Sequence, residues 1–586
     1  MLRGFRWQFL VLVMALVLFL TSLASRTSNA PVPVAEPTLI PPTATTEVVV
    51  VPTALPEVTV PAVIAPANNA IDTIPTYREA LVGRVGRLNP LFANLNPVDH
   101  DITSLIYEGL TRINEYGEPV PSLAKSWVIS SDGLEYVVEL REDILWQDGI
   151  AFNSNDVIYT MGILQDTEFP GDPALGAFWR TVEVQQLDTY LVRFRLTQSL
   201  GRFLDMLKIG ILPEHALRGT SAEQLLQHPF NLSPIGTGPY QLEALRTLDG
   251  SQTQIVDLRA APVYRQRPEG QSGYRVDRLS FHLFDSFESA VAGLQGGVVD
   301  GLFGRDRDES ARLMNLPGVN IYTTIEPTLG VLIFNWASDQ TAYFREQRLR
   351  SALQMGLDRS SIIERIMGTE AIRADSPLIA GSWAYVGDLP WPIPDAGAAR
   401  TMLQTVNIQR GGEATSETPN AIRFSILAPD DEKLRTLAQE VASQWSQLGI
   451  EVSVDVVDAA TYQSRLDNGE FGAALVELAM GDSADPDVYQ FWDADQYPDG
   501  KNFGGVDDRR IAEDLERGRS EPFSINRAIH YTNFQRNFIT RAIAIPLYYP
   551  IRTYAIATDV NGVQLGLLAS PASRFQNIQE WAVMLG

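Results

Sequence analysis

The chain contains no cysteine and only a few histidines. Its 586 residues include 5 histidines and 0 cysteines. The missing cysteine excludes disulfides, thiolate zinc sites and cysteine nucleophiles. The histidines are far apart in the sequence and form neither a His-x-x-x-His pair nor a glutamate-paired metal pattern. They are His100, His215, His228, His282 and His530. The sequence therefore predicts no metal site built on these two residue types.

Familiar catalytic and nucleotide-binding motifs are also missing. There is no Gly-x-Ser-x-Gly elbow, no Walker A loop and no Gly-x-Gly-x-x-Gly fingerprint. Pro239 interrupts the run Gly236-Thr-Gly-Pro-Tyr240, which indicates a rigid turn. The acidic stretch 482–499 does not fit a calcium loop, because Pro498 stands where the invariant glycine belongs. We expect no catalytic residue, cofactor or metal, although an acid pair assembled from distant residues, as in an exported hydrolase, stays open.

Acidic residues outnumber basic ones. The chain has 46 Lys and Arg against 71 Asp and Glu, a formal charge of -25. Such a charge repels phosphate backbones, so we expect no nucleic-acid partner. It also attracts cationic ligands, but an acidic surface more often serves solubility. The composition, 45% hydrophobic and 20% charged, is that of a globular protein, and the length predicts about three to four folded units.

The N-terminal segment 1–30 has the pattern of an export signal. Arg3 and Arg6 precede an apolar run over residues 9–20, and small residues at Ala24 and Ala30 offer cleavage sites. The run is of borderline length for spanning a membrane, so an uncleaved N-terminal anchor is the alternative. Either way the rest of the chain is expected outside the cytoplasm, anchored to the cell membrane or released as a periplasmic or secreted protein.

Residues 31–75 differ in composition from the rest of the chain. They are rich in Pro, Thr, Val and Ala and nearly free of charge. Prolines at this density favour an extended tether and oppose a core helix. We therefore expect a disordered Pro/Thr-rich linker between the N-terminal segment and the folded region.

The folded region alternates between two periodicities. Apolar residues alternate over 422–426, recur at helical spacing over 437–448, and alternate again over 450–456. This pattern predicts a β-α-β unit with parallel strands. A second such unit is expected over 279–303, whereas 127–195 is rich in strands and indicates an α+β insertion.

Several short motifs occur in a fixed order along this region. The longest, over 140–157, reads Leu-Arg-Glu-Asp-Ile-Leu-Trp-Gln-Asp-Gly-Ile-Ala-Phe-Asn-Ser-Asn-Asp-Val. The others are Pro121-Ser-Leu-Ala-Lys-Ser-Trp127, Ser131-Asp-Gly-Leu134, Ile235-Gly-Thr-Gly-Pro-Tyr240, Leu294-Gln-Gly-Gly-Val-Val-Asp300, Phe334-Asn335, Arg348-Leu-Arg-Ser-Ala-Leu353, Asp358-Arg359 and Ile545-Pro-Leu-Tyr548. The ordered series resembles the family 5 extracellular solute-binding proteins, which are the peptide and oligopeptide receptors of ABC importers.

The resemblance implies an α/β protein with the class II periplasmic-binding-protein fold. Two lobes would be joined by a two-strand hinge near residues 325 and 545, with an α+β insertion in lobe I. Ligand would bind between the lobes and be enclosed by a hinge motion. The implied parts are lobe I at 76–120, 236–325 and 546–586, the insertion at 121–235, and lobe II at 326–545.

The resemblance also implies ligand-binding residues. Counting back from Pro486 places Asp482 where the family carries an aspartate that pairs with the α-amino group of a peptide; an ammonium enclosed in a cleft needs such a carboxylate. Tyr107, Glu108 and Gly109 belong to a segment that resembles the family's strand near the cleft, whose edge could pair with an extended peptide. The alternative is that Tyr107 is an ordinary core residue of a strand. Trp383 and Tyr385 would line side-chain pockets or, alternatively, cap lobe II.

The implied function is that of an extracytoplasmic receptor, not an enzyme. It would capture short oligopeptides and deliver them to an ABC permease with its ATPase subunits, acting as a monomer and contacting the membrane through its N-terminal segment. Two alternatives stay open: a ligand-sensing receptor of the same fold acting on a membrane partner, and an ABC receptor for a non-peptide solute such as an oligosaccharide or a nickel complex. The chain has no lipobox cysteine, which excludes lipid anchoring by that route.

Overall fold

The structure, a computed structural model, describes residues 74–247, 253–271, 273–406, 422–481, 483 and 485–584. The expected N-terminal segment 1–30 lies outside these residues, as does the expected linker 31–75 apart from its last two positions. The described residues all belong to one compact unit. In the described part of the chain, no helix is both long enough and apolar enough to cross a membrane.

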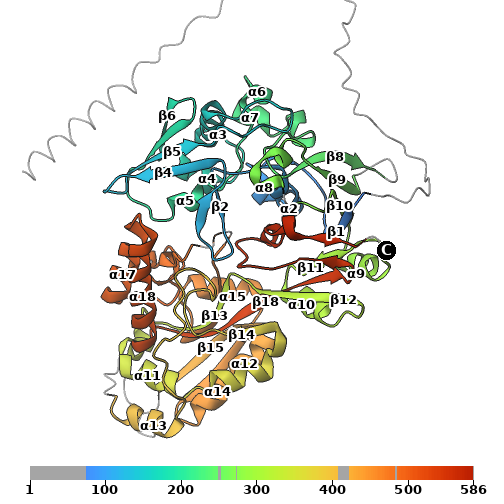
Figure 1. Ribbon diagram of the computed structural model, residues 1–586. Coiled ribbons are helices and arrows are strands. Elements are labelled where there is room, and N and C mark those ends of the chain that lie inside the picture. The colour runs from blue at the N-terminus through green and yellow to red at the C-terminus, as the bar shows by residue number, and fades with distance from the viewer. Residues whose placement is uncertain are drawn as a thin grey trace, which may run out of the picture. The chain divides into compact units, whose positions relative to one another are not determined.

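A mixed sheet of 12 strands forms the centre of the described chain (Figure 1). Strands from both ends of the sequence lie in it: β1, in blue, is one strand away from β18, in red. The main path is β16 (Glu451–Val457), β15 (Arg423–Pro429), β17 (Ala473–Ala479), β13 (Thr328–Phe334), β18 (Ile545–Ala557), β11 (Gly301–Phe303), β1 (Thr76–Val82), β10 (Arg278–Phe284), β9 (Ile255–Ala260) and β8 (Tyr240–Arg246). The two remaining strands, β12 (Val319–Ile325) and β14 (Ala371–Arg373), both pair with β18.

Strand β18 joins two halves of the sheet. Its first residues, from Ile545 to Pro550, pair with β13 and β14, whereas Ile551 and the residues after it pair with β12 and β11. The chain makes the reverse crossing between β12 and β13, through Glu326 and Pro327. Two strands thus connect the halves, which confirms the predicted two-strand hinge. The crossing on β18 lies at Pro550 and Ile551, a few residues after the expected position near 545.

The halves have separate hydrophobic cores. One core is built almost entirely from residues 329–549, and the other from residues 77–303 and 554–581. Along β18, Tyr549 belongs to the first core and Tyr554 to the second. Because each half buries its own apolar side chains, the halves are two lobes, as predicted.

Lobe II contains the predicted β-α-β unit. Strands β15 and β16 pair in parallel, and helix α14 (Glu432–Ser446) connects them. The predicted inward face of that helix is confirmed, because Leu437, Val441 and Trp445 are buried. The other lobe II helices are α11 (Gln347–Met355), α12 (Arg359–Ile366), α13 (Ala396–Gln404), α15 (Ala459–Asp467), α16 (Tyr489–Trp492), α17 (Arg509–Ser520) and α18 (Ser524–Thr540).

Lobe I contains the second unit in a modified form. Helix α9 (Phe287–Gln295) follows β10 and leads to β11, but the two strands are not neighbours. Strand β1 lies between them and pairs in parallel with both. Other elements here are α2 (Pro97–Ile106), α8 (Pro268–Gln271), α10 (Arg307–Met314) and the small sheets β2 (Thr111–Ile113) with β3 (Pro119–Pro121) and β19 (Val560–Asn561) with β20 (Ala582–Val583).

The insertion is an antiparallel sheet covered by short helices, which confirms the predicted α+β character. The sheet order is β4 (Ala124–Ile129), β5 (Glu135–Leu140), β7 (Leu191–Arg195) and β6 (Glu183–Asp188). Tyr136, Trp179, Phe194 and Phe203 form its aromatic centre. The helices are α3 (Ser154–Gln165), α4 (Pro173–Trp179), α5 (Phe203–Met206), α6 (Glu214–Leu217) and α7 (Ala222–Leu225).

Two of the sequence motifs contact one another where the insertion meets lobe I. The side chain of Gln147 accepts a hydrogen bond from Gly236 N at 2.9 Å and donates to Tyr240 O at 2.8 Å. Gly238 N donates to Ile106 O at 2.8 Å, at the end of α2. A Cβ atom on Gly236 would lie 1.8 Å from that same carbonyl oxygen. Glycine is therefore required at 236 by close backbone approach, and the motif is structural.

We expect Gly236→Ala to lower the free energy of unfolding by about 1–3 kcal/mol, because backbone atoms have to shift to admit the methyl group. Urea denaturation measures this change. Gly162→Ala on helix α3 is the matched control, since nothing lies within 4 Å of its Cβ position. Alanine favours the helix there, so the control is expected to be neutral or slightly stabilising. Equal losses in both variants would contradict the close-approach argument.

Candidate ligand-binding cleft

The insertion of lobe I contacts lobe II beside the residues that follow β17. Gly201, just before α5 of the insertion, donates through its backbone N–H to Arg519 O at 2.6 Å. The Arg527 guanidinium on α18 donates to Gly201 O at 3.1 Å. The Ser483 hydroxyl donates to the buried carboxylate of Asp205 at 3.0 Å. The insertion and lobe II are thus joined by hydrogen bonds.

A small cavity lies at this junction. Its volume, counted as the space open to the centre of a water molecule, is about 20 Å³. The walls are mainly apolar and come from the hinge, lobe II and the C-terminal segment. They are Pro327, Leu378, Ile379, Ser382, Met480, Ser483, Asp485, Pro486, Val488, Leu567 and Leu568.

Asp485, at the start of the segment 485–488, forms a buried ion pair. Asp485 accepts two hydrogen bonds from Arg527, both at 2.7 Å, and each of the two side chains is 4% exposed. Burial alone would lower the pKa of Arg527, but the negative charge of Asp485 outweighs it and that pKa is raised. Asp485 is thus neutralised within the protein and is not free to bind a ligand ammonium.

The predicted amine-binding residue, Asp482, lies outside the described residues. Its neighbour Ser483 is described and contacts Asp205 of the insertion. A role for Asp482 therefore stays a prediction.

The expected strand at Tyr107, Glu108 and Gly109 is not formed. These residues follow the end of α2 without regular secondary structure and are packed within lobe I. Tyr107 is buried and its hydroxyl donates to Leu88 O at 3.3 Å; burial raises the pKa of this tyrosine. Glu108 accepts from the Arg267 guanidinium at 2.9 Å. A Cβ atom on Gly109 would lie 2.4 Å from the backbone of Lys208. The carbonyls of Glu108 and Gly109 accept hydrogen bonds from within the chain, and peptide pairing at this segment remains a prediction.

Trp383 lies closer to the interlobe junction. Its backbone N–H donates to Tyr116 O, in the turn between β2 and β3, at 2.9 Å. Its ring meets the Tyr531 ring edge-on at 6.1 Å, and the guanidinium of Arg527 lies 5.3 Å from the ring centre. Tyr385 is half-buried, and burial followed by the charge of Asp375 raises the pKa of its hydroxyl. The structure thus brings Trp383, but not the Tyr107 segment, next to the Arg527–Asp485 pair.

Sequence reasoning missed Asp205, Ser382 and Arg527. Asp205 and Ser382 stand in no recognised motif, and Arg527 follows Asp485 by 42 positions. No sequence signal pairs this arginine with Asp485. Among the described residues, no cluster of His, Asp or Glu side chains could hold a metal ion.

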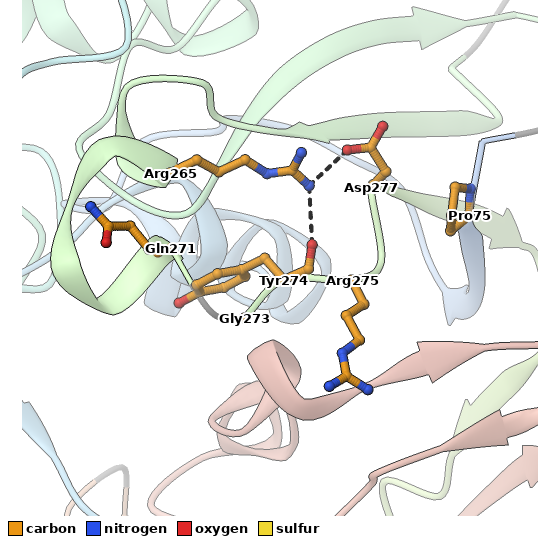
Figure 2. Close-up of a pocket in the computed structure, with 8 residues that line it drawn as sticks. Pro75, Arg265, Gln271, Gly273, Tyr274, Arg275 and Asp277 are labelled. Atoms are coloured by element: carbon orange, nitrogen blue, oxygen red, sulfur yellow. Dashed lines mark hydrogen bonds and ion pairs between the residues drawn. The ribbon is translucent and has the colours of Figure 1, made fainter.

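A wider concavity of about 640 Å³ lies on lobe I (Figure 2). Arg265 donates there to Tyr274 O at 3.0 Å and pairs with Asp277 at 2.7 Å, while Arg275 points away from both. Every lining residue belongs to lobe I or to Pro75 before β1. The concavity is therefore not part of the space between the lobes.

A sequence model of the bacterial extracellular solute-binding proteins, family 5 Middle, matches residues 118–500. The chain belongs to this family. The match covers the whole insertion, the second part of lobe I and most of lobe II, and it confirms the resemblance indicated by the ordered motifs.

A sequence relative and two solved structures are similar to this chain. The oligopeptide-binding protein AppA of Bacillus subtilis (strain 168) is 24% identical over 520 residues, which is 86% of this chain and 91% of AppA. The solved structure of HbpA2 from Haemophilus parasuis has a TM-score of 0.72 at 19% identity, covering 87% of this chain and 100% of that one. NikZ from Campylobacter jejuni, solved with Ni(L-His), has a TM-score of 0.59 at 23% identity and covers 87% and 99%. These structures share the fold of the family 5 protein described here.

Proposed function

We propose that this protein is an extracytoplasmic receptor that captures short peptides between its lobes and delivers them to an ABC permease. No bond is made or broken in this function. The observation that carries the proposal is the junction between the insertion and lobe II, where Gly201 and Ser483 form hydrogen bonds across the two parts and Ser483 also lines a small cavity. Family membership and the peptide-binding names of relatives support the same function.

The two-strand hinge supplies the mechanism of capture. The lobes have separate cores, so they can move as rigid bodies about Glu326 and Pro327. A ligand that contacts both lobes favours the closed state by its differential affinity for that state. The permease then distinguishes loaded from empty receptor by the relative position of the two lobe surfaces. We further propose that the receptor acts as a monomer, tethered to the membrane or released after cleavage near residue 30.

The test is native mass spectrometry of the full chain purified from cells grown in a rich medium, followed by denaturation and identification of the released molecule. Heterogeneous short peptides are the expected result. Release of a single nickel complex, haem or sugar would keep the receptor function but show that the ligand is not a peptide. This outcome is worth testing because NikZ was solved in complex with Ni(L-His). A protein that neither retains a solute nor binds added peptides would overturn peptide capture. That result would favour the alternative, a ligand-sensing receptor of the same fold that acts on a membrane partner.

We expect Asp482→Asn to weaken binding of peptides with a free amino terminus by about 10- to 100-fold, the usual value of a charged hydrogen bond. The same peptides with an acetylated amino terminus should bind both forms alike. Isothermal titration calorimetry on each peptide pair measures the difference. Asp499→Asn, at an exposed position further along the same acidic stretch, is the control. Equal losses for free and acetylated peptides would remove Asp482 from the amine site.

A further inference from the structure

A second contact joins the two lobes, apart from the one at the insertion. Helix α10 belongs to lobe I, because Leu313 on it shares a core cluster with Leu302 of β11. The guanidinium of Arg307, the first residue of α10, donates to the carboxylate of Glu477 on β17 of lobe II. It also donates to Asp431, just before α14 of lobe II, at 3.4 Å. One cation of lobe I thus binds two anions of lobe II.

This contact lies where the two lobes face one another. Arg307 comes shortly after the carboxyl end of β11, and Asp431 comes shortly after that of β15. Both strands pair in parallel with a neighbour, and the carboxyl ends of parallel strands border the ligand crevice in open α/β sheets. Separation of the lobes therefore moves Arg307 away from Glu477 and Asp431. An ion pair needs its nitrogen and oxygen within about 4 Å, so a small separation breaks it.

The two carboxylates of lobe II are held in place by other groups. The hydroxyl of Tyr548 on β18 donates to Glu477 at 2.7 Å. The Tyr548 ring lies against Gly330 of β13, where a Cβ atom would be 2.3 Å from the ring. Burial raises the pKa of Tyr548, so its hydroxyl stays protonated and remains a donor. Asp431 is the N-cap of α14. Neither carboxylate has to rearrange to bind Arg307.

Arg307 balances the negative charge of Glu477. Burial alone would lower the pKa of Arg307, but the charge of Glu477 helps to outweigh burial, and that pKa is raised. Burial raises the pKa of Glu326 in the hinge; Arg552, its partner at 2.6 Å, opposes this rise, and the charge of Glu477 adds to it. Arg307 therefore neutralises a carboxylate that otherwise repels the hinge carboxylate.

All of these partners are groups of the protein itself, so the contact favours the state with the lobes together whether or not a ligand bridges them. We propose that Arg307 is an electrostatic latch between the lobes, whose ion pairs with Glu477 and Asp431 break before the lobes separate and so slow both entry and release of the solute. The latch goes beyond capture of a solute, since Arg307 acts on the lobes and not on the ligand, although it rests on the hinge motion of the proposed function.

The absence of cysteine allows a direct test, because two introduced cysteines are then the only sites for a thiol-reactive spin label. Gln295→Cys on α9 of lobe I and Gln439→Cys on α14 of lobe II are exposed positions. Pulsed electron paramagnetic resonance on the labelled full chain, dialysed without added ligand, should give one main distance. Arg307→Met should add a longer distance and lower the ratio of closed to open protein by at least about tenfold, the usual value of a hydrogen bond to a charged group.

Two further variants identify the cause. Arg312→Met, on the same helix, is the matched control, since Arg312 pairs with Glu288 inside lobe I. It should leave the distances unchanged. Glu477→Gln removes the charge and keeps an acceptor for Tyr548, and it should show part of the effect of Arg307→Met. Adding Glu477→Gln to Arg307→Met should change little more, because each removes the same ion pair.

Exchange rates separate a latch from a ligand contact. Stopped-flow tryptophan fluorescence with trialanine measures entry and release. In Arg307→Met both rates should rise, by up to about tenfold, so that the affinity changes less than either rate. If Arg307 bound the solute itself, release alone would accelerate and the affinity would fall in proportion.

The outcomes distinguish the latch from the proposed function. Distances in Arg307→Met that match those in Arg312→Met, or an effect that Glu477→Gln does not share, overturn the latch and leave the receptor function standing. If the unmodified protein binds neither trialanine nor any other peptide, peptide capture fails, while the distances measured without added ligand still decide the latch.

Discussion

Replacing Arg574 with methionine is expected to lower the free energy of unfolding by about 3–5 kcal/mol, the usual cost of removing one partner from a buried ion pair. Its guanidinium donates to Glu79 at 2.9 Å and to Asp101 at 3.0 Å, and all three side chains are 1% exposed. Burial already raises the pKa of Glu79 with Arg574 in place. Without the guanidinium, Glu79 loses its charged partner inside lobe I.

Urea denaturation at neutral pH measures the loss. Arg312→Met is the matched control, because Arg312 pairs with Glu288 on the surface, where both side chains are at least 50% exposed. Surface pairs of this kind contribute little. A loss in Arg574→Met no larger than in the control would mean that the network connecting β1, α2 and the C-terminal segment is not stabilising.

The second large effect is expected at Arg527. Substitution by methionine removes the pair with Asp485, and it also removes the hydrogen bond to Gly201 O in the insertion. We expect the free energy of unfolding to fall by about 3–5 kcal/mol, since Asp485 is left buried without its cation. We also expect the unliganded protein to have a larger radius of gyration in small-angle X-ray scattering, because one interlobe contact is lost.

A double-mutant cycle with Asp485→Asn tests the cause. The two substitutions should be strongly non-additive, with a coupling of about 2–3 kcal/mol, because each removes the same ion pair. The exposed pair Arg365–Glu440, at 57% and 29% side-chain exposure, serves as the reference cycle. Additive losses of unfolding free energy at Arg527 and Asp485 would show that other contacts hold the segment 485–488 in place.

Some side chains that sequence patterns assign to the surface are buried. Arg350, in the motif Arg348-Leu-Arg-Ser-Ala-Leu353, lies on a helix where a charge run usually indicates a solvated face. It is 2% exposed, donates to the carbonyls of Ala542 and Phe344, and lies 3.8 Å from the Trp336 ring centre. Burial lowers its pKa to about 9. Its acceptors are backbone oxygens, which leave no trace in the sequence.

Asn335, the second residue of the motif Phe334-Asn335, has a positional role in the structure. The amide donates to Gly469 O at 2.8 Å and to Phe471 O at 2.9 Å, which secures the start of β17 against the end of β13. The motif marks the residue, but its partners are backbone oxygens that the sequence does not reveal.

The sequence by itself determined the fold class, the two lobes, the hinge and the β-α-β unit of lobe II. Periodicity reports the buried face of each element, and ordered motifs report the family, so both properties are local along the chain. Only the tertiary structure decided which strand lies between β10 and β11, that Asp485 is neutralised by Arg527, and that Ser382 lines an interlobe cavity. These contacts join residues far apart in sequence, and their energies depend on burial and distance, which arise only when the chain has folded.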